Sequence, residues 1–279
     1  RKVLKKIEGA SDAGYEMRGQ VAPRPIGILL GLTTTLSPFT TRPSFTEVAG
    51  LGLAERIASL RDPGRKARIL AEPTGHGFQR LFRLMDEGRK IWLMTDPPNY
   101  EPDPEDSLHA QATARGIDPW SYIYDTLLQN GGKALLYTPF ANYAENNLDC
   151  CRDMILHKDT VMGLGDGGAH VGTICDGSFP TTLLQHWGRD RDGARLDVEF
   201  LIQRQARDTA RLVGLHDRGV LAPGYRADLN VIDFDRLRVH QPELLYDLPA
   251  GGRRVVQRAD GYIKTIVACV ESYTEGEAT

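Results

Sequence analysis

One stretch of the sequence surrounds a carboxylate with glycines. Asp166 lies in Gly-Leu-Gly-Asp-Gly-Gly-Ala-His at 163–170, directly after the apolar residues 161–162. The apolar residues predict a short buried strand, and the glycines predict a tight loop that a ligand can approach closely. A carboxylate just past the carboxyl end of a barrel strand can bind a metal ion or take a proton from water. Asp166 could equally cap the following turn by accepting backbone N–H bonds, and its spacing does not decide between the two roles.

A second motif is Ala-Pro-Gly-Tyr-Arg-Ala-Asp-Leu-Asn-Val-Ile-Asp at 222–233. It predicts a Pro-Gly turn that enters an alternating strand, with Asp228 as a turn or strand-entry residue and not a catalyst. Residues 217–225 contain two glycines and a proline, and we expect a boundary there.

Strand-like and helix-like segments alternate up to about residue 215, which favours parallel βαβ units. After that point the pattern turns to short strands, and the polar tail at 273–279 is expected to fray. The expected helices are residues 45–60, 65–71, 107–115, 119–129, 145–157 and 196–214. The expected strands are residues 19–32 (interrupted by Pro23 and Pro25), 90–94, 134–137, 160–164, 227–233, 254–257 and 262–270.

Together the two motifs resemble the amidohydrolase superfamily, and more narrowly its branch of D-aminoacylases and N-acyl-D-amino-acid deacylases. Residues 58–65 and 215–219 also match this branch in character. The resemblance implies an α/β fold: the C-terminal part of a (β/α)₈ TIM-like barrel over residues 1–216, followed by β-sandwich strands over residues 217–279.

The resemblance also implies a chemistry, the hydrolysis of a non-peptide linear amide by a zinc-activated water. In this branch the amide belongs to an N-acyl-D-amino acid. The resemblance assigns Asp166 as the general base and acid and as a Zn²⁺ ligand. His170, Asn142 and Tyr143 are candidate substrate contacts, together with Arg189. Each of these could instead be an ordinary loop or surface residue.

The histidines depart from the family pattern. No two of the seven are two positions apart, so the HxH pair of the family is missing, and Asp166 is the one convincing metal ligand. His76, His157 and His186 are weak substitutes, since a helix end or a packed position explains the last two. We expect the remaining ligands to lie upstream of Arg1.

Composition limits the partners. The chain has 34 basic and 37 acidic residues, a formal net charge of −3, and no apolar run of transmembrane length. We therefore expect a small-molecule amide substrate, no nucleic acid and no membrane. The four cysteines, two of them adjacent, suit reduced thiols in a cytoplasmic protein.

Two other interpretations stay open at this point. The chain could be a catalytically incomplete fragment or a metal-free interaction module, and the open sheet edges of a partial barrel would then favour association with another copy or with a missing N-terminal half. A nucleotide-binding α/β enzyme is the third hypothesis. It is disfavoured because no convincing helix follows the glycines at 163–168.

Overall fold

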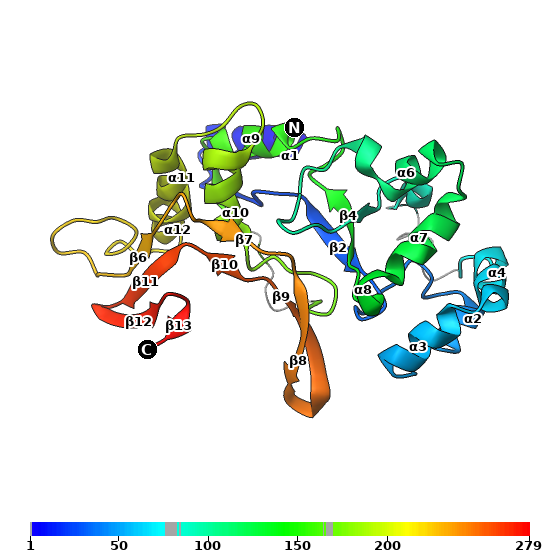
Figure 1. The fold of residues 1–279 in the computed structure, drawn as a ribbon. Coiled ribbons are helices and arrows are strands. Elements are labelled where there is room, and N and C mark those ends of the chain that lie inside the picture. The colour runs from blue at the N-terminus through cyan, green and yellow to red at the C-terminus, as the bar shows by residue number, and fades with distance from the viewer. Residues whose placement is uncertain (1, 76–82, 84, 164, 166–169) are drawn as a thin grey trace.

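The structure, a computed structural model, describes residues 2–75, 83, 85–163, 165 and 170–279. Helices and strands alternate up to α12, and strands dominate from β6 to the C-terminus (Figure 1). The helices are α1 (Lys2–Asp12), α2 (Pro43–Thr46), α3 (Leu53–Leu60), α4 (Pro63–Ala71), α6 (Leu108–Ala114), α7 (Pro119–Leu127), α8 (Gln129–Gly132), α9 (Asp149–Leu156), α10 (Phe179–Thr182), the π-helix η4 (Leu183–Asp190), α11 (Val198–Gln205) and α12 (Arg207–Leu212), with short 3₁₀ turns η2 (Asp86–Gly88), η3 (Pro104–Asp106) and η5 (Pro249–Gly251).

The strands are β1 (Gly19–Val21), β2 (Ile26–Leu30), β3 (Trp92–Leu93), β4 (Leu136–Ala141), β5 (Thr160–Met162), β6 (Leu229–Ile232), β7 (Arg238–Val239), β8 (Glu243–Leu248), β9 (Gly252–Val256), β10 (Ala259–Asp260), β11 (Tyr262–Val267), β12 (Val270–Thr274) and β13 (Glu277–Ala278). The break between β1 and β2 falls at the two prolines, as predicted. The mixed α/β class predicted from the alternation of elements is therefore confirmed.

Local capping explains where several helices begin. Asp62 accepts hydrogen bonds from the N–H groups of Gly64 and Arg65, and Asp118 accepts one from Ser121 at 2.8 Å. Each aspartate is followed by a proline at the first helical position, where a missing N–H costs nothing. Helices α4 and α7 thus begin at Asp-Pro pairs that are visible in the sequence.

Strand direction differs from the prediction. β1 and β5 pair in parallel, with Gly19 opposite Thr160 and Val21 opposite Met162. The three-stranded sheet β2-β4-β3 is antiparallel throughout, so the expectation of parallel βαβ units is wrong there. Alternation of strands and helices does not fix whether two strands run parallel or antiparallel, because a connection can lead the chain back into the sheet at either end of the neighbouring strand.

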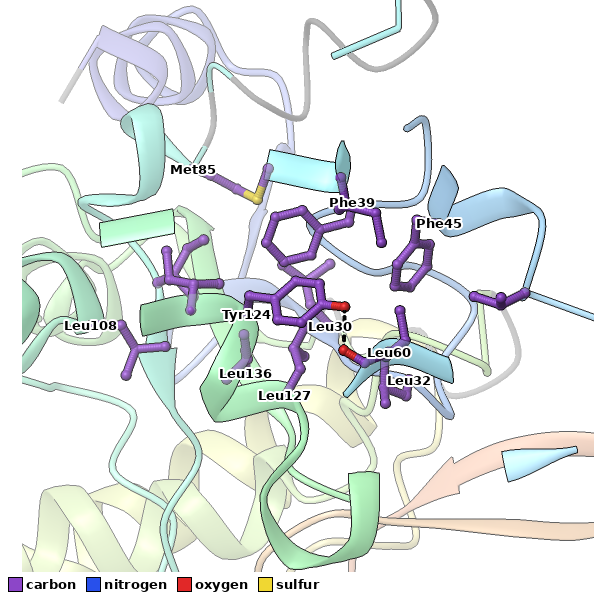
Figure 2. Packing of buried hydrophobic residues seen from close by; sticks show 14 of the residues in the cluster. Leu30, Leu32, Phe39, Phe45, Leu60, Met85, Leu108, Tyr124, Leu127 and Leu136 are labelled. Atoms are coloured by element: carbon purple, nitrogen blue, oxygen red, sulfur yellow. Dashed lines mark hydrogen bonds between the residues drawn. The ribbon is translucent and has the colours of Figure 1, made fainter. Parts of the chain in front are cut away.

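The largest core cluster lies between the β2-β4-β3 sheet and helices α2, α3, α4, α6 and α7 (Figure 2). Tyr124 is 2% exposed, and its hydroxyl donates to the Leu60 carbonyl at 2.8 Å, so this aromatic residue is buried without an unpaired polar atom. Phe39 packs edge-on against Tyr124 with ring centroids 5.4 Å apart. This core holds the outer helices against β2 and β4.

Four of the C-terminal strands form an antiparallel sheet in the order β13-β12-β11-β6, and the others pair as β7 with β10 and β8 with β9. Tight turns join its last strands: Ala268 and Cys269 have φ of 51° and 66°, and Glu275 and Gly276 have φ of 49° and 83°. Paired positive φ values match the twist of a two-residue hairpin. The prediction of a fraying tail is therefore wrong, because β12 and β13 pair within it. The boundary near residue 217 stays a prediction.

Two sequence expectations concern the cysteines and membrane-spanning segments. All four cysteines, Cys150, Cys151, Cys175 and Cys269, are free thiols. Over the described ranges, from residue 2 to 279 with their gaps, none of the helices has the length and apolar character needed to cross a bilayer.

Candidate functional site

A pocket of about 320 Å³ opens where the parallel strands β1 and β5 end. Gly163 follows β5, and its N–H donates to the Val21 carbonyl at 3.0 Å, which continues the strand pairing to the edge of the pocket. Pro23 follows β1 in the same wall. The carboxyl ends of parallel strands are where α/β proteins bind ligands, because the loops that follow them converge there. The pocket is lined by Pro23, Met162, Gly163, Gly165, Asp176, Gly177, Phe179, Pro180, Leu183, Gln205 and Thr209.

Asp166, the strongest candidate from the sequence, lies outside the described residues, as does His76. Gly165, which directly precedes Asp166 in the sequence, lines the pocket together with Gly163. The structure thus describes a pocket beside the motif, and the role of Asp166 remains a prediction.

The segment after the motif is fixed by backbone hydrogen bonds on two sides. The Thr173 carbonyl accepts from Leu29 N at 2.7 Å, and the Gly172 carbonyl accepts from Thr35 N at 2.9 Å. On the other side, the Val171 carbonyl accepts from Val255 N in β9 at 2.6 Å. These contacts hold the chain between residues 171 and 176 beside the pocket.

Asp176 is a pocket residue that the sequence reasoning missed. It is 5% exposed and contributes to the lining. Its carbonyl accepts from Phe179 N at 3.0 Å, at the entry to α10. The available signal was a second acidic residue ten positions after Asp166, in the same glycine-containing loop.

His170, a predicted substrate contact, is exposed and has φ of 52°. Its carbonyl accepts from Thr173 N at 2.8 Å and from Ile174 N at 2.9 Å, so its backbone forms the turn that starts the segment above. It does not belong to the pocket lining. This geometry matches the loop-histidine alternative, and substrate contact by the imidazole stays a prediction.

Asn142 and Tyr143, the other predicted contacts, are also absent from the pocket lining. The Asn142 carbonyl accepts from the Cys150 thiol at 3.4 Å. Tyr143 is 3% exposed, its hydroxyl donates to the Pro102 carbonyl, and its ring packs edge-on against Trp92 with centroids 6.0 Å apart. Burial raises the pKa of the Tyr143 hydroxyl above its usual range. Both residues have structural contacts, and their roles as substrate contacts stay untested.

Three further candidates also make structural contacts. Arg189 donates to the carbonyls of residues 234, 235 and 237, which ties η4 to the loop before β7. His157 caps the end of α9, with Nε2 3.0 Å from a Glu8 carboxylate oxygen. His186 lies in η4, with Nε2 3.0 Å from a Glu101 carboxylate oxygen.

A metal centre needs three or four ligands at defined geometry. Among the residues that the structure describes, no group of three or more His, Cys, Asp or Glu side chains is placed to hold one. The described part of the chain therefore does not fit a zinc ion by itself.

A model of the amidohydrolase family matches residues 3–277. Two curated proteins named 5-methylthioadenosine/S-adenosylhomocysteine deaminase, from Desulfitobacterium hafniense strains DSM 10664 / DCB-2 and Y51, are each 36% identical to the chain over 111 residues. These matches cover 34% of this chain and 26% of each relative. The chain thus spans about a quarter of the length of these relatives.

Three solved structures are also similar in part. "Crystal structure of D-aminoacylase defines a novel subset of amidohydrolases" shows 21% identity and a TM-score of 0.36, covering 68% of this chain and 35% of that one. A D-aminoacylase mutant in complex with CuCl₂ shows 19% identity and a TM-score of 0.35 over the same shares. A structure described by the role of its binuclear metal centre shows 17% identity and a TM-score of 0.35, covering 80% of this chain and 51% of that one.

Proposed function

Because this chain belongs to the amidohydrolase family, we propose that it forms part of an enzyme that hydrolyses a non-peptide linear amide, with an N-acyl-D-amino acid as the substrate. The motifs at 163–170 and 222–233 support this branch of the family. The expected membership of the superfamily is confirmed by a match over nearly the whole chain. The barrel, the sandwich and the substrate remain parts of the proposal.

The pocket at the ends of β1 and β5 is the observation that carries the proposal. Its wall includes Gly165, the neighbour of Asp166, and the apolar side chains of Phe179 and Leu183. An apolar wall suits the acyl chain or the amino-acid side chain of such a substrate. Asp166 takes a proton from the attacking water in this proposal, and then donates it to the leaving nitrogen as the C–N bond breaks, which yields a carboxylate and an amine.

Zn²⁺ is the metal that the proposal names, with Asp166 as one ligand. The described residues do not complete a metal site. The other ligands would have to come from outside the described residues. The proposed substrate contacts remain His170, Asn142 and Tyr143.

The test is amine release from paired N-acetyl-D- and N-acetyl-L-amino acids by the intact protein supplied with Zn²⁺. Asp166→Asn keeps the size of the side chain but removes the base, and we expect activity to fall by about 10²-fold or more. Asp106→Asn, at an exposed position on η3, is the matched control and should leave activity unchanged. Full activity in Asp166→Asn would refute the assigned base, and equal rates on both enantiomers would refute the D-specific substrate.

Deamination is a second candidate, because the curated relatives are named as deaminases and are 36% identical over 111 residues. Ammonia release from 5′-methylthioadenosine by the same preparation tests it directly. If neither substrate class reacts in the zinc-supplied protein, the remaining hypothesis is a catalytically incomplete fragment or a metal-free interaction module.

A further inference from the structure

A pocket of about 280 Å³ opens where the parallel strands β1 and β5 begin, at the opposite end of this strand pair from the first pocket. The segment before β1, the turn before β5 and helices α11 and α12 surround it. The same two helices supply Gln205 and Thr209 to the first pocket, so one helical unit borders both pockets.

Arg204 places a fixed positive charge in the wall of this pocket, which we call the basic pocket. The residue is 7% exposed, and its Nη2 donates to the Thr160 carbonyl at 2.5 Å and to Thr160 Oγ1 at 2.8 Å. Its Nη1 donates to Asp208 Oδ2 at 3.2 Å. These bonds join α11 to the first residue of β5, so the guanidinium is already ordered before any anion binds.

Cations outnumber acids at the basic pocket. The ion pairs of its lining residues add Arg207, 3.0 Å from Asp208, and Asp159, which lies 3.5 Å from Arg18 and 3.6 Å from Lys158. With these two included, five cations accompany three acids: Arg18, Lys158, Arg204, Arg207 and Arg211 against Glu16, Asp159 and Asp208. The surplus of two positive charges favours a doubly charged anion over a singly charged one.

Three of the lining cations are accessible to solvent. Lys158 and Arg211 are exposed, and the Arg18 side chain is 33% exposed. Within the part of the chain that the structure describes, the side chains of Lys158 and Arg211 donate to no protein acceptor, and the ion pair of Lys158 with Asp159 spans 3.6 Å. Their N–H groups are therefore available to an acceptor that enters from water. Glu8 lies 3.0 Å from His157 Nε2, and neither of these two residues lines the basic pocket.

We propose that the basic pocket binds a phosphate group, with Arg211 and Lys158 as accessible donors and Arg204 as a fixed charge. The planar fork of an arginine matches two oxygens of a phosphate, and a lysine ammonium adds a point charge. The volume lies just below the roughly 300–1,000 Å³ of pockets that enclose a whole ligand, so it admits inorganic phosphate or the phosphate end of a small ester. The basic pocket lies away from the first pocket, so this inference does not depend on the proposed amide hydrolysis.

The test is isothermal titration calorimetry of the 279-residue protein with sodium phosphate at pH 8, where phosphate is mainly a dianion. Sodium acetate at equal ionic strength is the monoanion for comparison. We expect phosphate to bind saturably at one site, and acetate to bind at least about tenfold more weakly. Glycerol 3-phosphate distinguishes the source: binding at least as tight as that of phosphate indicates the end of an organic ester, and weaker binding indicates free phosphate.

Arg211→Gln is the decisive variant, because it removes an exposed charge in the last turn of α12 that has no protein acceptor in the described chain. We expect phosphate affinity to fall at least about fivefold, with urea unfolding nearly unchanged. Arg61→Gln is the matched control: Arg61 is also exposed at the end of a helix, α3, but does not line the basic pocket. It should keep phosphate affinity. Equal affinities for phosphate and acetate, parental affinity in Arg211→Gln, or the same loss in Arg61→Gln would overturn the proposal.

Discussion

Glu101 is the centre of an ion-pair cluster. The loss in the free energy of unfolding on removing its carboxylate can be calculated from its pKa. Its Oε1 accepts from Leu148 N at 2.7 Å and from Arg191 Nη2 at 2.9 Å, and its Oε2 accepts from Arg191 Nε and His186 Nε2, each at 3.0 Å. Burial by itself would raise the pKa of this carboxyl. The hydrogen bonds from His186, Arg191 and Leu148 outweigh that effect and lower the pKa from 4.5 to about 2.

Glu101→Gln therefore tests whether this cluster holds α9, η4 and the 97–103 loop together. The lowering of the pKa from 4.5 to about 2 corresponds to a ceiling of about 3 kcal/mol on the stabilisation at neutral pH. The side chain keeps 17% of its exposure, and Arg191, 5% exposed, retains a 2.7 Å contact with Asp149. Water contact and the second partner reduce the expected loss to about 1–3 kcal/mol.

The assay is urea unfolding of parent and variant at several pH values. A lowered pKa in the folded state contributes stability above pH 4.5, and this stability is lost as the pH falls from there toward 2. The gap between parent and Glu101→Gln should thus be largest at pH 7 and shrink below pH 4.5. Glu105→Gln, an exposed change in the neighbouring turn η3, is the control and should cost little. A loss under about 0.5 kcal/mol at pH 7, or a gap that does not change with pH, would refute the reasoning.

Three further expectations follow from the packing and the thiols. Leu136→Ala, at a 0% exposed position in β4, should lower the free energy of unfolding by about 2–5 kcal/mol in urea melts, and a loss below 1 kcal/mol would contradict the assigned core. The neighbouring Cys151 thiol lowers the pKa of the Cys150 thiol. Cys151→Ala should therefore slow labelling of Cys150 by iodoacetamide at pH 7 roughly 3- to 10-fold, as read by peptide mass spectrometry. An unchanged rate would show that Cys151 does not affect the Cys150 thiol. The outer strands β6 and β13 of the C-terminal sheet each have one neighbour in the described sheet, and a free strand edge can pair with another chain. We therefore propose self-association. A monomeric elution volume in gel filtration at all concentrations would rule it out.

Local signals predicted much of the fold. The prolines at 23 and 25 placed the break between β1 and β2, and the helix expected from residue 119 begins there as α7. The helix expected from residue 65 begins two residues earlier, at Pro63, because Asp62 caps it. The long helix predicted over 196–214 is divided at Ala206, with φ of −103° and ψ of −69°, into α11 and α12. Its apolar pattern runs through the division, so periodicity could not detect it.

Features that depend on distant contacts escaped the sequence reasoning. The antiparallel direction of β2 and β4 depends on the end of the sheet at which the chain re-enters it. The burial of Tyr143 depends on contacts with Trp92 and Pro102, which are distant in the sequence. A pocket of about 190 Å³ that Arg24 and Thr182 both line escaped for the same reason, since these residues are 158 positions apart in sequence and meet only in the folded chain. Gly163 and Gly165 of the motif at 163–170 line the first pocket, and the role of Asp166 stays a prediction.

The segment at 171–173 affects the solubility of the protein, because it covers one edge of β2. β2 reads Ile-Gly-Ile-Leu-Leu, an uncharged apolar stretch of the kind that stacks into aggregates when its edge is free. One edge of β2 is paired with β4, and hydrogen bonds between Leu29 and Thr173 cover the other edge. The loop that borders the pocket thus also covers the edge of an aggregation-prone strand. Substitutions that loosen this loop should therefore yield insoluble protein before they yield soluble protein that is merely inactive.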